Sequence, residues 1–308
     1  MQVEITPGFW AERQQVNAEK AIFHQWRMLE NSGCIENFRI AAGLSTSWRE
    51  GWFFADSDAY KWLDAASRIL QMHPDRALAD LVDDFISLLG KAQNPDGYIF
   101  TYNQVHFPST RWQNLQIEHE LYCHGHLIEA GVSHFLTTGS TTLLDIARKA
   151  ADRVCADFAG KGTRFTPGHE EIEVALLRLF QATGYTPYLN QAEQFIRQRG
   201  RDWTFGLGLL KQQKMHTGRA ELVKARQEEY LKDHPGYRPL RLPPGNAARK
   251  PKGIQLRWAA SVLSGKYFQQ HQPAARQRVP VGHAVRYTYL AAASAMLDRL
   301  TGKRVYLP

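Results

Sequence analysis

The chain repeats a short signal in which a Thr-Gly pair is followed, five residues after the glycine, by a leucine. The three copies are Thr138-Gly139 with Leu144, Thr183-Gly184 with Leu189, and Thr301-Gly302 with Leu307. The first two copies lie 45 residues apart. An interval of this length accommodates two helices of about 15 residues with short loops, so each repeat predicts an αα-hairpin. Because one hairpin cannot bury its own apolar stripe, the hairpins must stack against one another.

Apolar residues recur at helical spacing over most of the remaining chain, and strand-type alternation is nearly absent. The expected helices cover 58–72, 76–93, 117–136, 143–158, about 169–183, 189–199 and 283–300. The predicted fold class is therefore all-α, and we favour closure of the hairpins into an α/α barrel over an open superhelix. The last hairpin lacks a second helix, so the barrel is expected to be incomplete at its C-terminus. Either the chain is a truncated portion of a longer protein, or its final helix packs without the usual partner.

The formal net charge of +8 comes from one segment. Residues 203–280 hold 15 Lys and Arg against 4 Asp and Glu, and prolines and glycines between 235 and 253 break any regular periodicity. We therefore expect 203–266 to be a basic Pro/Gly-rich insertion or linker with one short helix at about 218–231. It would separate two parts of the barrel, 1–202 and 267–308. No nucleic-acid-binding motif accompanies the charge, so a solvated surface is favoured over a nucleic-acid partner.

The sequence shows no signal peptide and no apolar run long enough to cross a bilayer. This predicts a cytoplasmic protein that does not act at a membrane. The three cysteines, Cys34, Cys123 and Cys155, form no CxxC pair, so their spacing predicts neither a disulfide framework nor a thiolate zinc site. Cys123 is expected to be a small core residue. Nothing in the sequence indicates an oligomeric state.

Three of the twelve histidines stand at predicted helix starts. His169 and His283 each follow a glycine at a loop-to-helix transition, and His119 lies two residues into the helix expected from Ile117. The inner helices of an α/α barrel run parallel, so these side chains are expected to meet at one mouth of the ring and form a polar cleft. A neutral imidazole both donates and accepts, which suits the hydroxyl groups of a sugar, and a helix N-terminus disfavours the charged ring.

Two other roles for the three histidines are weighed. A structural role, in which each ring bonds a local backbone carbonyl, stays open. A metal triad is disfavoured, because no short spacing links the three residues. The other polar side chains singled out in the sequence are expected to cap or pack rather than to catalyse: Asp56, Asp58, Glu170, Glu171, Glu173, His124, His126 and His216.

Seven short motifs are spread along the chain: Gly8-Phe9-Trp10, Asn37-Phe38-Arg39-Ile40-Ala41-Ala42-Gly43, Asp56-Ser57-Asp58-Ala59-Tyr60-Lys61-Trp62-Leu63, Ala92-Gln93-Asn94-Pro95-Asp96-Gly97-Tyr98, His119-Glu120-Leu121-Tyr122-Cys123, Gly168-His169-Glu170-Glu171-Ile172-Glu173 and Gly282-His283-Ala284-Val285-Arg286. Their order and spacing are similar to those of glycoside hydrolase family 127, the bacterial β-L-arabinofuranosidases. The resemblance covers residues 1–202 and about 267–308. It implies an (α/α)6 barrel of the six-hairpin glycosidase type, followed in the family by β-sandwich domains.

The resemblance also implies an activity, the release of terminal L-arabinofuranose with retained configuration. His119, His169 and His283 match family histidines that hydrogen-bond the sugar. The family's nucleophile is a cysteine thiolate held on zinc by further Cys and Glu ligands, and its acid/base is a glutamate. All of these lie beyond the position where this chain stops, and none of its three cysteines sits in a matching motif. The resemblance therefore assigns no catalytic residue and no metal ligand here.

Two further departures concern the N-terminal part and the basic segment. A family glutamine that contacts the sugar has no counterpart, because the stretch between Trp26 and Asn37 is shorter. The segment from Trp203 to about Gly265 does not resemble the family.

Three functional hypotheses follow. The first is a glycoside hydrolase resembling the retaining β-L-arabinofuranosidases, in which this chain supplies residues that bind an L-arabinofuranosyl-type sugar. Alone, such a chain is expected to be inactive. The second is a non-catalytic carbohydrate-binding or partner-binding α/α protein. The third is a sugar epimerase, which uses a similar barrel and paired histidines as acid and base.

Overall fold

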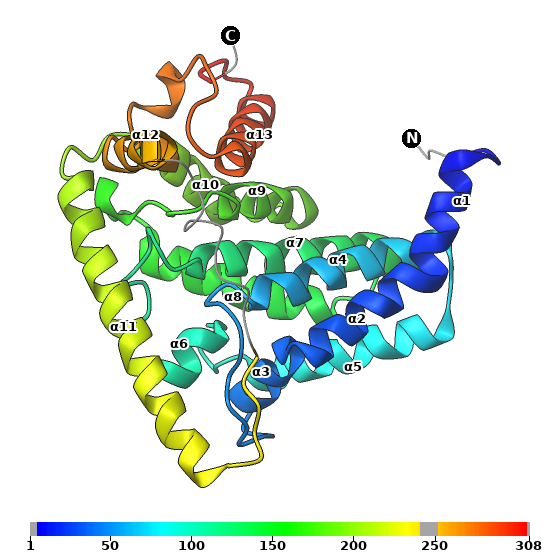
Figure 1. Ribbon diagram of the computed structural model, residues 1–308. Helices are drawn as coiled ribbons and strands as arrows, with labels where there is room; N and C mark the ends of the chain where they lie inside the picture. The colour runs from blue at the N-terminus through cyan, green and yellow to red at the C-terminus, as the bar shows by residue number, and fades with distance from the viewer. Residues whose placement is uncertain (1–4, 241–251, 307–308) are drawn as a thin grey trace.

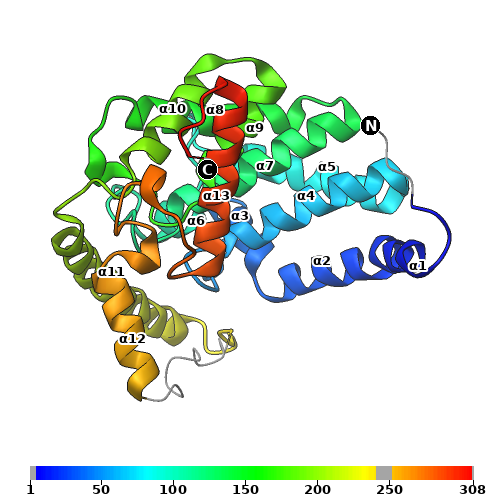
Figure 2. The same cartoon turned by 90° about the horizontal axis from the view of Figure 1, so that it is seen from above.

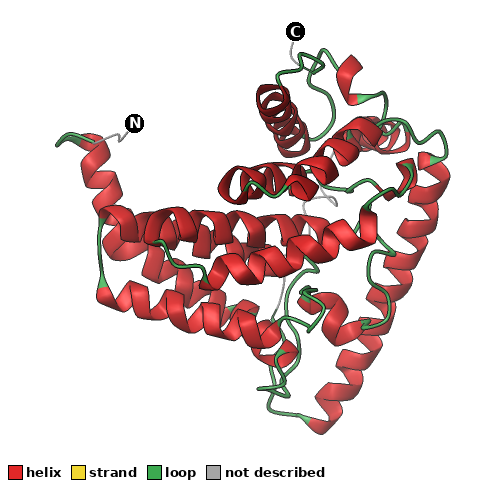
Figure 3. Ribbon diagram, turned by 180° about the vertical axis from the view of Figure 1, so that it is seen from behind, coloured by secondary structure: helices red, strands yellow, loops and turns green. Residues whose placement is uncertain are grey.

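The computed structural model describes residues 5–240 and 252–306. Within these ranges the chain folds into helices joined by loops, and no strand occurs there (Figure 3). The longer helices are α1 (Phe9–Val16), α2 (Ile22–Asn31), α3 (Cys34–Ala41), α4 (Asp56–Met72), α5 (Arg76–Ala92), α6 (Thr101–His106), α7 (Glu120–Thr138), α8 (Thr142–Phe158), α9 (Ile172–Thr183), α10 (Thr186–Gln198), α11 (Phe205–Asp233), α12 (Lys252–Leu263) and α13 (Ala284–Thr301). Short helical turns cover Asn17–Ala21, Thr163–Phe165, Lys266–Phe268 and Ala274–Arg276.

The helices form an inner and an outer layer (Figure 1). In the inner layer α4 packs on α7, α7 on α9, and α9 on α13. In the outer layer α5 packs beside α8, and α8 beside α10. Each of α4, α7 and α9 also packs on the helix that follows it in the chain, so the layers are built from hairpins. This arrangement is the all-α, α/α-barrel type predicted from the repeat.

The Thr-Gly repeat marks the ends of inner helices. Gly139, Gly184 and Gly302 end α7, α9 and α13 in the left-handed conformation, with φ angles of 76°, 68° and 69°. Glycine adopts this conformation without the steric cost that a Cβ atom adds. The predicted hairpins α7–α8 and α9–α10 are therefore confirmed. Leu307 of the third copy lies outside the described residues.

Two apolar clusters hold the layers together. The first joins the helices from α2 to α8 and includes the fully buried Phe38, Tyr60 and Phe85. The second joins α7 to α10 and α13 and includes the fully buried Phe158 and Phe195. Both clusters contain residues of α7, so this helix is the central element of the fold.

The basic segment is more regular than its sequence predicts. Instead of a short helix at 218–231, α11 runs over 29 residues, and α12 follows at 252–263. Figure 1 shows α11 running across one end of the other helices. Side-chain contacts fix it there: Gln212 Oε1 accepts from the backbone N of Gln116 at 2.7 Å, and Arg226 Nη1 donates to the carbonyl of His106 at 2.7 Å.

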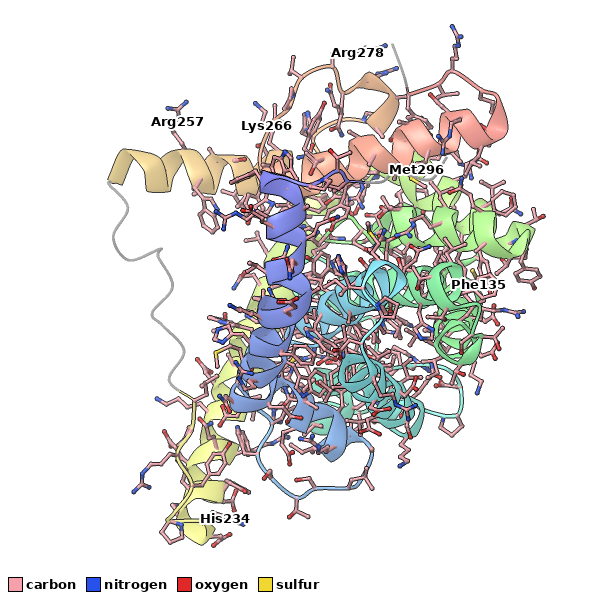
Figure 4. The ribbon with its side chains drawn as sticks, turned by 90° about the vertical axis from the view of Figure 1, so that its right-hand side faces the viewer. Phe135, His234, Arg257, Lys266, Arg278 and Met296 are labelled. Atoms are coloured by element: carbon pink, nitrogen blue, oxygen red, sulfur yellow. The ribbon has the colours of Figure 1, made fainter. Side chains whose placement is uncertain are left out.

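The far part of the basic segment projects from the body. Figure 4 shows His234 at the distal end of α11 and Arg257 pointing outward from α12. In the view from above, both helices lie on the side of the molecule opposite α1 (Figure 2). The prolines and glycines that predicted a linker fall partly at 241–251, outside the described residues. The proposed boundaries at 202/203 and 266/267 stay predictions.

Several helix starts are shifted from their predicted positions. α7 begins at Glu120 and α9 at Ile172, rather than near Ile117 and His169. α4 begins at Asp56 without a side-chain cap, so a capping role for Asp56 is wrong. Among the helices of the described residues, none is long and apolar enough to cross a membrane.

Candidate functional site

The three histidines at helix starts lie side by side. His119 is the N-cap residue of α7, His283 is the N-cap residue of α13, and His169 lies in the loop just before α9. The ring centroids of His119 and His169 are 5.1 Å apart, and those of His169 and His283 are 5.8 Å apart. Because α7, α9 and α13 are neighbours in the inner layer, their N-terminal ends meet at one place. The predicted convergence of the three rings is confirmed.

Two loops that pack against each other position His119 and His169. Gly168 N donates to the carbonyl of Leu115 at 3.0 Å, and Gln116 Nε2 donates to the carbonyl of Thr166 at 2.9 Å. A Cβ atom on Gly168 would lie 2.2 Å from Leu115 O, so only glycine allows this approach. The Gly-His pair that marked the helix start in the sequence therefore also brings two histidine-bearing loops together.

The backbone contacts of the three rings set their tautomers. His119 Nδ1 lies 3.0 Å from the carbonyl of Ile117, and His169 Nδ1 lies 2.8 Å from the carbonyl of Glu170. A carbonyl oxygen only accepts, so in both rings Nδ1 carries the proton and Nε2 is left as an acceptor. His283 is the reverse, because its Nδ1 accepts from the backbone N of Arg286 at 3.4 Å. Neutral His283 therefore carries its proton on Nε2, and the cluster offers two acceptors and one donor.

The three rings are neutral at pH 7. Burial, and after it the nearby guanidinium of Arg286, lower the pKa of His119 to about 3. The same two causes, burial first, hold the pKa of His169 far below its ordinary value and that of His283 below it. Desolvation disfavours a charged imidazolium, and a nearby cation adds to that effect. The neutral state expected from the helix N-termini is thus reinforced mainly by burial.

Aromatic side chains surround the histidines. Phe53 and Phe54, from the loop before α4, lie with ring centroids 5.2 and 5.4 Å from that of His119. Tyr122 of α7 lies 4.5 Å from His169, and Tyr267 lies 5.2 Å from His283. Aromatic faces of this kind can stack on the C–H face of a sugar ring. Sequence reasoning assigned none of these four residues to the site, because a single aromatic residue more often packs in a core than contacts a ligand.

Helix α11 adds a fourth histidine beside the cluster. The ring of His216 lies 5.3 Å from that of Phe53, which also contacts His119. His216 Nδ1 is 3.3 Å from Glu118 Oε1. No sequence pattern pointed to this contact, since 98 residues separate His216 from Glu118.

The three glutamates that follow His169 are buried and not exposed to solvent. Glu170 and Glu173 each form an ion pair of 2.9 Å with Arg199, and all three side chains are at most 1% exposed. Burial raises the pKa of Glu170 to about 7, although Arg199 opposes the shift. Glu171 is also fully buried, with Oε1 3.5 Å from His126 Nδ1. Burial, with the nearby Glu129, raises its pKa well above the ordinary value. The ion pairs of Glu170 and Glu173 with Arg199 connect the loop that carries His169 to the end of α10.

Asp56 does not reach the histidines, whereas Asp58 lies near them. Asp56 is buried and accepts from the backbone N and the hydroxyl of Thr101 at 2.7 and 2.5 Å. Asp58 pairs with Lys61 at 3.6 Å, and the Lys61 ammonium lies 5.0 Å from the ring centroid of Tyr122.

The cysteines and acids present do not fit a zinc-thiolate centre. Cys34 and Cys123 are buried, and burial raises the pKa of both thiols far above the ordinary value. Burial also raises the pKa of Cys155 to about 12. A thiolate is the form that binds metal or attacks a substrate, and these thiols are protonated at neutral pH. Within residues 5–240 and 252–306, no group of three or more His, Cys, Asp and Glu is arranged to hold a metal ion. The expectation that Cys123 is a core residue is confirmed.

The chain is similar in sequence and structure to known enzymes. Residues 2–307 match the family described as β-L-arabinofuranosidase, GH127 catalytic domain. The chain is 31% identical over 327 residues to a non-reducing end β-L-arabinofuranosidase of Bifidobacterium longum subsp. longum, in a match that covers 98% of this chain and 44% of that relative.

Two solved structures extend the comparison. One is a GH127 β-L-arabinofuranosidase from Geobacillus stearothermophilus T6, with a TM-score of 0.79 and 35% identity over 99% of this chain and 43% of that chain. The other is a GH127 β-arabinofuranosidase, with a TM-score of 0.74 and 30% identity over 99% of this chain and 40% of that chain. The chain therefore spans less than half the length of each of these relatives.

Proposed function

Because this chain belongs to the GH127 β-L-arabinofuranosidase catalytic-domain family, we propose that it binds a terminal β-L-arabinofuranosyl residue through His119, His169 and His283. The observation that carries the proposal is the contact of three neutral imidazoles from three separate helix starts, with ring centroids 5.1 and 5.8 Å apart. A sugar hydroxyl both donates and accepts. A cluster with two imidazole acceptors and one imidazole donor therefore matches several hydroxyls of one small sugar ring.

The surrounding residues favour a neutral sugar over a charged ligand. The imidazoles carry no charge at pH 7, and Glu170 and Glu173, which follow His169, are paired with Arg199. The rings of Phe53, Phe54 and Tyr122 supply apolar contact area beside the histidines. Aromatic contacts and a few placed polar groups are the usual composition of a small-molecule site.

We propose further that this chain contributes binding rather than bond cleavage. Covalent catalysis needs an activated nucleophile, and the thiols of Cys34, Cys123 and Cys155 are all protonated at neutral pH. The zinc that the family resemblance implies would activate a thiolate, and no described residues fit that ion. Glu170 and Glu171 are fully buried, which argues against a role for either as the acid that protonates a leaving group.

The proposal is tested by calorimetric titration with methyl β-L-arabinofuranoside. We expect His119→Ala, His169→Ala and His283→Ala each to weaken binding by roughly three- to tenfold, the effect of one lost hydrogen bond. His24, which is exposed on α2, provides a matched control, and His24→Ala should bind as the wild type does. Circular dichroism must show unchanged helix content in all four variants.

Two assays discriminate binding from other activities. The isolated chain should not release para-nitrophenol from para-nitrophenyl β-L-arabinofuranoside, and it should not change the epimeric composition of L-arabinose. Binding that survives all three site substitutions would contradict the proposed site. Release of para-nitrophenol by purified wild-type chain would contradict a purely binding role.

A further inference from the structure

A cavity lies between the first half of α11, the loop at 111–116 and the turn Thr163–Phe165. Its volume is about 740 Å³, within the range of small-ligand sites. It shares two loops with the histidine cluster, because Gln116 lies three residues before His119 and Thr166 three residues before His169. None of the three cluster histidines lines this cavity.

The cavity is positively charged. Arg111, Lys161, Arg164 and Lys211 line it, against the single carboxylate of Asp202. Arg111 is already paired, with Asp96 at 2.6 Å and Asp157 at 3.7 Å. Among the described residues, no carboxylate forms an ion pair with the other three cations. Lys161, Arg164 and Lys211 therefore leave positive charge available to a ligand.

The cavity wall also contains a hydrogen-bond acceptor beside these cations. Gln116 lines the cavity wall, and its buried Oε1 has no hydrogen-bond partner within the described part of the chain. A buried acceptor without a partner costs free energy that a hydroxyl donor would recover. Sulfate offers no such donor at neutral pH, whereas a sugar does.

Two aromatic side chains give the cavity flat apolar walls. Phe165 is 39% exposed, and the Lys161 ammonium lies 4.9 Å from its ring centroid. Trp112 is held in place, because its Nε1 donates to Asp157 Oδ2 at 2.7 Å and its backbone N donates to the carboxylate of Glu120. A fixed ring beside unpaired cations suits a ligand that is both flat on one face and anionic.

We propose that this cavity binds an acidic sugar, that is, a glycuronic acid residue of an oligosaccharide. The carboxylate would pair with Arg164 and Lys211, and the ring would lie against Phe165. The hydroxyls would meet the amide groups of Gln113 and Gln116. A nucleic acid is the less suitable occupant, because three unpaired cations around one cavity do not form the extended track that a phosphate backbone needs. The proposal does not rest on the histidine cluster.

The test compares two probes that differ at their carboxyl groups. Trigalacturonic acid and its methyl ester share their hydroxyl groups, but the ester lacks the carboxylate charge. We expect the acid to bind the full chain about tenfold or more tightly than the ester, with an affinity that falls as salt rises. The double variant Arg164→Gln/Lys211→Gln should weaken binding of the acid about tenfold. Both side chains are exposed, so the substitutions should not affect folding.

A matched variant separates the site from overall charge. Lys214→Gln/Lys224→Gln removes the same number of exposed cations from α11 without touching the cavity, and it should leave binding within about twofold of the wild type. His119→Ala should also retain trigalacturonate binding, even if it loses the arabinofuranoside.

Three results would overturn the proposal. The first is equal affinity for acid and ester, and the second is an equal loss in the two double variants. The third is displacement of the trisaccharide by sulfate at the same concentration, which would indicate an anion site without sugar recognition.

Discussion

The guanidinium of Arg219, on α11, contacts the carboxylate of Glu118, the residue directly before His119. Both side chains are buried, at 6% and 0% exposure. Glu118 Oε1 also lies 3.3 Å from His216 Nδ1, so one carboxylate joins two residues of α11. This contact fixes the long helix of the basic segment to the start of α7. Because Glu118 directly precedes His119, the contact also helps to position His119 through the backbone of residues 117–119.

Removing the cation from this pair should destabilise the fold. In Arg219→Gln the carboxylate of Glu118 keeps a buried charge with no full counter-ion, which typically costs about 3–5 kcal/mol. We expect a decrease of this size in the free energy of unfolding measured with urea. The double variant Glu118→Gln/Arg219→Gln should recover part of the loss, since it leaves no unpaired charge. Lys224→Gln, on an exposed face of the same helix, is the control, and an equal decrease there would contradict the explanation.

Gly125 of α7 should not tolerate a larger side chain. A Cβ atom at this position would lie 1.6 Å from Glu171 Oε2, so α7 and the loop before α9 approach closely only at a glycine. Gly125→Ala should lower the free energy of unfolding by about 1–3 kcal/mol, the usual cost of overpacking. It should also weaken arabinofuranoside binding, because Glu171 and His169 lie in one short loop.

A double-variant cycle checks the cause of this effect. In a Glu171→Ala background the clash with the carboxylate is absent, so adding Gly125→Ala should cost much less than in the wild type. Equal costs in the two backgrounds would show that the contact with Glu171 is not the reason.

Sequence patterns predicted the helices whose apolar residues face one core. The Thr-Gly pairs at 139 and 184 located the ends of α7 and α9, because a left-handed glycine is a local signal. The same reasoning failed for α11. Its glycines at 206, 208 and 218 lower the helix propensity, and its leucines at 207, 210 and 222 are exposed instead of forming a buried stripe. Contacts with the end of α6 at His106 and with the loop at 116–118 stabilise that helix, and such distant contacts leave no local pattern.

The histidine cluster was predictable for a similar reason. A glycine before His169 and before His283 marks a loop-to-helix transition, and the hairpin repeat brings neighbouring helix starts together. The residues that support the cluster left no such mark. Arg199 reaches Glu170 and Glu173 from the end of α10, and Tyr267 reaches His283 from a short turn. These pairings depend on tertiary structure alone.

The neutral histidines should make stability depend on pH in one direction. The folded-state pKa of His119 is about 3, below the value of about 6.5 for an unfolded chain. Its contribution to stability is therefore complete above about pH 6.5 and is lost as the pH falls toward about 3, because the unfolded state takes up the proton first. As the pH falls from about 6 to 4, the free energy of unfolding should decrease less steeply in His119→Gln than in the wild type. The two slopes should differ by up to about 1.4 kcal/mol per pH unit.

Other groups titrate in part of this range, so the comparison is between variant and wild type. Burial raises the pKa values of Glu120 and Glu170 to about 7, and their effect has the opposite sign, with stability lost as the pH rises from about 4.5. Both carboxyls are present in His119→Gln, so the difference in slope reports His119. Urea unfolding at a series of pH values measures it, and identical slopes would contradict the shifted pKa.

The most direct measurement of the central claim is a proton–nitrogen correlation spectrum of the imidazole rings, recorded while methyl β-L-arabinofuranoside is added. The spectra of the free protein should show His119 and His169 protonated on Nδ1 and His283 protonated on Nε2. On titration, the side-chain signals of these three residues should shift together and give one dissociation constant, while that of the exposed His24 stays constant. Signals of the three rings that remain unchanged at saturating sugar, or that move with different dissociation constants, would contradict a single sugar site at the N-termini of α7, α9 and α13.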